Sequence, residues 1–112
     1  MKINITVNGQ NQFEYFLNTL LLGCITAILN KKANIADMEN LIFNPRIAKY
    51  LTENFDYMQC INIITLGMEL EDIESLVPEC LDDELIKLQN MLLDNFNNLK
   101  LSNHTSINIT AS

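Results

Sequence analysis

The chain has little glycine, proline and histidine, and these shortages restrict both its fold and its chemistry. Its 112 residues include three glycines, two prolines and one histidine. So few turn-forming residues argue against the many tight turns of an all-β sandwich. The glycines are isolated, so no Gly-rich phosphate loop occurs, and His104 lies in the polar C-terminal tail. We therefore expect no catalytic residues and a protein that is not an enzyme.

The three cysteines, Cys24, Cys60 and Cys80, are widely spaced, and no two of them form a C-x-x-C motif. This spacing offers neither a zinc knuckle nor a thioredoxin-like pair, and reduced thiols in a cytosolic protein are the usual alternative. The acidic residues do not follow the alternating pattern around a central glycine that a calcium loop needs. The sequence therefore predicts no metal ion and no cofactor.

The segment "LLLGC", residues 20–24, is similar to a bacterial lipoprotein cleavage site. However, Lys2 is the only base before it, and Glu14 lies close to the apolar run. A signal peptide has a positive flank and an uninterrupted apolar stretch. The run at residues 20–29 is also far shorter than the ~20 residues that span a bilayer. We therefore expect a cytoplasmic protein without a membrane partner.

Negative charge is concentrated in one part of the chain. The net charge is −7, and the stretch "GMELEDIESLVPECLDDE", residues 67–84, holds eight acids and no base. Six acids and seven bases are spread over the rest of the chain. A body without basic excess and with one strongly negative region repels phosphates and anionic lipids. Nucleic acid and membrane surfaces are therefore not expected as partners.

Helical spacing of apolar residues predicts five or six short helices between residues 11 and 100. Asn34 and Asn44 are placed to cap two of them, because Asp37 lies three residues after the first and Pro45 directly follows the second. Two further predicted caps are Asn11 and Asp56. The expected fold class is mainly α, an irregular bundle formed by a single helical domain of residues 1–100.

Both ends of the chain show the alternating pattern of a β-strand. Ile3 and Ile5 alternate with polar residues near the N-terminus, and Ile107 and Ile109 do so in the polar tail of residues 101–112. Terminal segments are usually loose unless something holds them. The sequence therefore leaves two alternatives open, a small strand pair formed by the termini or two frayed ends.

The acidic stretch needs an explanation beyond solubility for part of its length. Acids near the first turn of the last predicted helix favour the helix dipole by ~0.3–1 kcal/mol each. The four acids before them fall toward the C-terminal half of a predicted continuous helix over residues 66–77, where negative charge is unfavourable. A basic protein partner would explain that cost; a merely solvated face is the alternative. The predicted partner-binding residues are Glu69, Glu71, Asp72, Glu74, Glu79, Asp82 and Asp83.

Two segments, "LIFNPRIAKYL" and "IITLGMELEDIESLVPE", resemble a small bacterial family with a helical body and a Leu-Gly-x-Glu-Leu-Glu-Asp segment, here residues 66–72. In size and acidity the chain also resembles the immunity proteins of contact-dependent growth-inhibition systems. This resemblance implies a cytoplasmic antitoxin that binds and neutralises a cognate basic toxin domain, often a nuclease. The alternative is a small regulatory or assembly subunit without a toxin partner.

Overall fold

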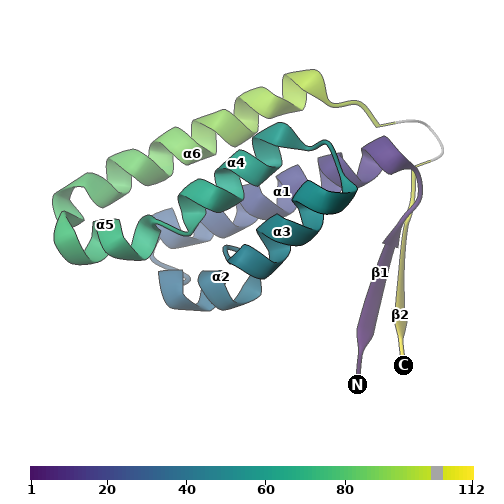
Figure 1. The fold of residues 1–112 in the computed structure, drawn as a ribbon, viewed down its shortest axis with the longest axis horizontal. Helices are drawn as coiled ribbons and strands as arrows, with labels where there is room; N and C mark the ends of the chain where they lie inside the picture. The colour runs from purple at the N-terminus through teal and green to yellow at the C-terminus, as the bar shows by residue number, and fades with distance from the viewer. Residues whose placement is uncertain (102–104) are drawn as a thin grey trace.

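In the computed structural model, which describes residues 1–101 and 105–112, six α-helices and two short strands follow one another along the chain (Figure 1). His104 lies outside the described residues. The elements are β1 (Ile3–Val7), α1 (Gln10–Leu29), α2 (Ile35–Leu41), α3 (Pro45–Asn54), α4 (Met58–Gly67), α5 (Leu70–Leu76), the 3-10 turn η1 (Pro78–Cys80), α6 (Leu81–Asn95), the 3-10 turn η2 (Phe96–Asn98) and β2 (Ile107–Ala111). The predicted fold class, a mainly helical bundle with a strand pair formed by the termini, is confirmed.

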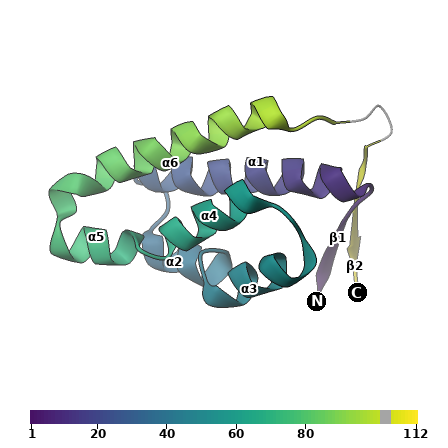
Figure 2. The same ribbon diagram turned by 45° about the horizontal axis from the view of Figure 1, so that its top comes forward.

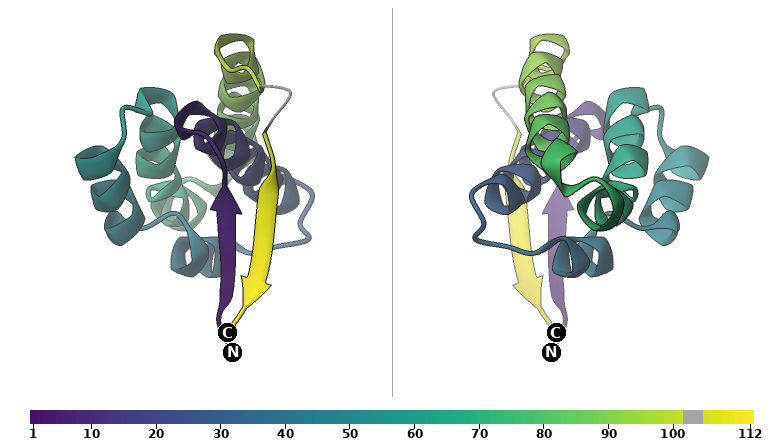
Figure 3. Two further views of the ribbon diagram at one scale, coloured as in Figure 1. Left: turned by 90° about the vertical axis from the view of Figure 1, so that its right-hand side faces the viewer. Right: turned by 90° about the vertical axis from the view of Figure 1, so that its left-hand side faces the viewer.

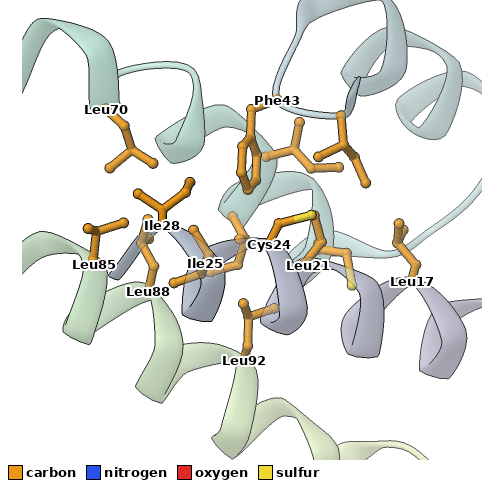
Figure 4. Close-up of a cluster of buried hydrophobic side chains, with 14 of the residues drawn as sticks. Leu17, Leu21, Cys24, Ile25, Ile28, Phe43, Leu70, Leu85, Leu88 and Leu92 are labelled. Atoms are coloured by element: carbon orange, nitrogen blue, oxygen red, sulfur yellow. The ribbon is translucent and has the colours of Figure 1, made fainter. Parts of the chain in front are cut away.

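The bundle is built around α1 and α6, which pack along each other in opposite directions, with α4 against both (Figure 2). Their apolar faces meet in one cluster, in which Leu21, Ile25 and Leu88 are fully buried (Figure 4). By length and composition alone, Gln12–Leu29 is apolar enough to cross a membrane, a property that core helices of soluble proteins and signal sequences share. The expected cytoplasmic location therefore stays a prediction.

The asparagine caps predicted for α2 and α3 are confirmed. The Asp37 amide donates to Asn34 Oδ1 at 2.7 Å, and the Ile47 amide donates to Asn44 Oδ1 at 3.0 Å. The other two predicted caps are wrong, because α1 already begins at Gln10 and α4 begins only after Tyr57. The buried Tyr57 ring stacks on Phe55 with centroids 4.7 Å apart. Tyr57, rather than Asp56, is the residue that directly precedes the helix.

The continuous helix predicted over residues 66–77 is also wrong, because α4 ends at Gly67 and α5 begins at Leu70. A Cβ atom at position 67 would overlap the ring of Phe43, a side chain that is only 1% exposed. The helix can therefore pass Phe43 only at a glycine. The chain then turns, and Leu70 enters the core with no exposed surface.

A polar contact crosses the apolar core at Asn18 of α1, whose side chain is fully buried. Asn18 Nδ2 donates to the carbonyl oxygen of Leu92 at 3.0 Å, and Asn18 Oδ1 accepts from Asn95 Nδ2 at 2.9 Å. The Cys60 thiol of α4 lies 3.9 Å from the same oxygen. These hydrogen bonds hold α1 and α6 in one register, because any sliding would leave buried amide groups unsatisfied.

The Gly67→Ala substitution should lower the free energy of unfolding by about 1–3 kcal/mol, because the added methyl group overpacks the core at Phe43. Gly23→Ala is the matched control. Position 23 is an exposed helical site with no atom within 4 Å of the new Cβ, so alanine there should stabilise by up to about 1 kcal/mol. Urea denaturation followed by circular dichroism measures both; an unchanged or higher midpoint for Gly67→Ala would contradict the assigned role of Phe43.

Asn18→Ala and Asn95→Ala should each lower the free energy of unfolding by about 1–3 kcal/mol, because each leaves a buried amide without its partner. The double variant should lose less than the sum of the two, since both substitutions remove the same hydrogen bond. Asn90→Ala, at an exposed position of α6, is the control and should change stability by less than about 0.5 kcal/mol. Strictly additive effects in the same denaturation assay would argue against the coupling.

Candidate functional site: the acidic end

The predicted partner-binding residues all lie on one contiguous part of the structure, formed by α5, η1 and the first turn of α6. These elements make up the end of the bundle opposite the two strands (Figures 1 and 2). We call this region the acidic end. Its eight acidic residues are Glu69, Glu71, Asp72, Glu74, Glu79, Asp82, Asp83 and Glu84. Seven of them are exposed and Glu84 is half-buried.

The break between α4 and α5 changes the electrostatic setting of these acids. Glu71 and Asp72 lie in the first turn of α5, and Glu69 is the residue just before it. The expectation that they fall toward the C-terminal half of a helix is therefore wrong, because it assumed a helix that runs through Gly67. Carboxylates in a first turn are stabilising. Helix dipoles thus account for more of the cluster than the sequence indicated.

What the fold does not supply is a set of cationic partners. Within residues 1–101 and 105–112, the two ion pairs shorter than 4.0 Å are Lys49–Glu53 at 3.9 Å and Lys87–Glu84 at 3.8 Å. Only the second involves the acidic end. The other seven carboxylates there lie on the surface, and among the described residues none of them has a base at ion-pair distance, so no ion pair neutralises the charge that they present to solvent.

Two of these acids share a groove with two lysines that the sequence did not connect to them. Glu74 and Asp82 line a cavity of about 490 Å³ together with Lys31 and Lys32. The lysines belong to the turn that ends α1, where Lys31 adopts φ 61°. The "KK" pair was visible as a helix end, but its closeness to residues some 40 positions later depends on tertiary packing. The groove is therefore of mixed charge, with an apolar floor that includes Leu85.

A second depression joins acids to exposed apolar side chains. Glu69 and Asp72 line it together with Leu76 and Val77, which are 77% and 41% exposed. An exposed leucine within an acidic rim resembles the arrangement of protein–protein interfaces, in which an apolar centre is surrounded by polar groups. The sequence analysis did not single out Leu76, and it placed Val77 on the apolar stripe of Leu66, Leu70 and Ile73, although Val77 is exposed.

Glu39 of α2 extends the acidic end on a third side. Its Oε1 atom is buried and has no hydrogen-bond partner among the described residues. Burial raises the pKa of the Glu39 carboxyl, and a contact with the Glu71 carboxyl and the charges of Glu71 and Asp72 raise it further. The acids of α5 therefore have different surroundings: Glu71 contacts Glu39 of α2, Glu74 lines the groove with the lysines, and Asp72 lines the depression with Leu76. They share one end of the bundle but not one flat face.

A sequence profile for a family of proteins of unknown function, DUF3969, matches residues 8–110. The chain belongs to this family. The match includes the helical body, the acidic end and most of β2. In the comparisons, no curated protein and no solved structure matches the chain. Membership of this family assigns no function to the acidic end. The function of the acidic end must therefore be argued from its residues.

Glu39→Gln should raise the free energy of unfolding at neutral pH, because it removes a carboxylate that is held beside Glu71 and Asp72. A carboxyl whose pKa is raised in the folded state destabilises the fold once it is charged. The destabilisation therefore disappears as the pH falls toward 4.5, the ordinary pKa of a glutamate carboxyl. The gain from the substitution should therefore shrink between pH 7 and about pH 4.5.

Chemical denaturation at a series of pH values measures this difference. Glu53→Gln removes an exposed carboxylate from α3 and serves as the control, with no comparable gain expected. A gain for Glu39→Gln that is independent of pH would show that packing, rather than charge, is responsible.

Proposed function

We propose that the protein is a non-enzymatic immunity protein, an antitoxin that binds a cognate basic toxin domain through the acidic end. The observation that carries this proposal is the set of seven surface carboxylates without a base within 4.0 Å among the described residues, two of which, Glu69 and Asp72, line a depression with the exposed Leu76. The resemblance in size and acidity to immunity proteins of contact-dependent growth-inhibition systems gives the partner class. The proposed place of action is the cytoplasm, where the toxin would act.

The chemistry of a nuclease fits this surface. A nuclease presents a positive cleft to phosphates, and carboxylates can occupy that cleft with bidentate contacts to arginine. Opposite charges also speed the encounter, which favours rapid neutralisation of a toxin. Leu76 would then supply the apolar contact that charge alone does not give, since buried apolar anchors dominate binding energy at most interfaces.

The alternative is a small regulatory or assembly subunit whose acidic residues only keep it in solution. The mixed groove favours this reading in one respect, because Lys31 and Lys32 already place positive charge beside Glu74 and Asp82. The dependence of partner binding on salt concentration distinguishes the immunity protein from the regulatory subunit. Steering by the acidic end requires that binding weakens as salt screens the charges.

Reversing the charges of four acids of the acidic end, Glu69, Glu71, Asp72 and Glu74, to lysine should weaken binding to the basic partner by roughly 100-fold or more, because each lost or repelled contact costs on the order of 1 kcal/mol. The partner is first isolated by capture on the tagged wild-type protein from the native cell and identified by mass spectrometry. Titration calorimetry then gives the dissociation constants at low and high salt.

The control reverses two exposed acids far from the acidic end, Glu53 of α3 and Asp94 of α6, and so changes the net charge by half as much. It should leave the affinity within a few-fold of wild type. Equal loss in both variants would mean that net charge, rather than this surface, drives binding. An unchanged affinity after the four reversals would exclude the acidic end as the binding site.

A further inference from the structure

The two terminal strands form a ribbon that projects from the helical body (Figure 3). Every residue of β2 is exposed, and so is every residue of β1 except the half-buried Val7. The four isoleucines Ile3, Ile5, Ile107 and Ile109 are 46–67% exposed. A two-stranded ribbon is marginal in water unless its apolar face packs against something. The ribbon therefore exposes a surface that residues 1–101 and 105–112 do not cover.

The pairing of the strands sorts their side chains onto two different faces. Ile5 lies opposite Ile109, Val7 opposite Ile107, and Ile3 opposite Ala111, so one face of the ribbon is wholly apolar. The other face carries only asparagine and threonine, in the pairs Asn4–Thr110 and Thr6–Asn108. An exposed sheet face that is apolar along its whole length marks an interaction surface.

The ribbon has an approximate two-fold symmetry of its own. Both strands carry the sequence Ile-Asn-Ile-Thr, at residues 3–6 and 107–110, and they pair antiparallel with Ile5 opposite Ile109. A rotation of 180° about an axis between these two residues brings each strand onto the other. The apolar face therefore presents the same row of side chains from either end, which suits the self-complementary contact of a two-fold dimer.

Charge favours a second copy over a basic partner at this surface. Neither strand contains a charged residue, whereas the eight acids of the acidic end lie at the opposite end of the bundle (Figures 1 and 2). A cationic partner would find nothing to bind on the ribbon. Two copies joined at their ribbons would keep their acidic ends far apart, so their net charge of −7 each opposes the contact little.

The apolar face of the ribbon continues into a neighbouring groove, which enlarges the surface available to a second copy. A stable interface buries about 800 Å² on each partner, and a five-residue, two-stranded face with its side chains supplies on the order of half of that. The apolar surface continues from Val7 and Ile107 into a groove of about 450 Å³ against α1, lined by Tyr15, Phe16 and Leu101. Leu101 is half-exposed. The ribbon and this groove therefore form one continuous apolar surface that is smaller than a standard interface, which suits a weak, micromolar dimer.

We propose that the apolar face of the ribbon binds a second copy of this chain. Two ribbons stack face to face about a two-fold axis, with the isoleucines between them and the asparagines and threonines outside. The resulting two-layer arrangement of four strands lies at the centre of the dimer, and the two acidic ends point away from it.

Sedimentation equilibrium on the wild-type protein at about 100 μM, where a micromolar dimer is nearly saturated, should give twice the chain mass of 12.8 kDa. The double variant Ile5→Lys/Ile109→Lys should raise the dissociation constant of the dimer roughly 100-fold or more, so that about half or more of the chains are monomeric at this concentration. The matched control, Thr6→Lys/Asn108→Lys, places the same charges on the polar face and should remain a dimer.

Circular dichroism confirms that each variant keeps the helical body. If the lysine variant fails to fold, Ile5→Thr/Ile109→Thr replaces it, since threonine keeps the β-branched shape while removing apolar surface. A monomeric wild type overturns the proposal. So does a dimer that survives the isoleucine substitutions, or one that is lost equally in the polar-face control, because another contact would then hold the copies together.

Discussion

The packing of α1 against α6 is the contact on which the other elements of this fold depend. Asn18 and Asn95 join the two helices by a hydrogen bond inside an otherwise apolar cluster, and Asn18 also binds the backbone of α6 at Leu92. A purely apolar seam tolerates several registers, whereas a buried amide pair accepts one. With α1 and α6 fixed, α4 packs against both. The start of α6 in turn determines where η1 and α5 lie, and so where the acidic residues are displayed.

Sequence reasoning found what depends on local chemistry. The Asn34 and Asn44 caps follow from hydrogen bonds within four residues, and the alternating isoleucines at both ends indicated strands before any pairing was known. The break after Gly67 could not be found in this way, because its cause is the ring of Phe43, more than 20 residues earlier. The helical spacing of Leu66, Leu70 and Ile73 continued across the break and concealed it.

The same limit applies to the candidate site. The residues of the acidic end were visible in the sequence as a run of like charge, but their directions were not. Glu39 and the pair Lys31 and Lys32 reach this region only through the turn after α1 and the packing of α2 on α5. Leu76 is likewise exposed at the last residue of α5, which the helical spacing did not indicate. Charge composition thus located the region, and tertiary packing decided which groups share a surface.

The pairing of β1 with β2 has a consequence for the order in which the chain folds. Residues about 100 positions apart must meet before the first of these backbone hydrogen bonds can form, and closing so long a loop costs conformational entropy that local helical contacts do not. The helices bring the two chain ends to the same side of the bundle and thereby shorten the distance that remains. The two strands are therefore expected to pair late in folding, after the helical bundle has assembled.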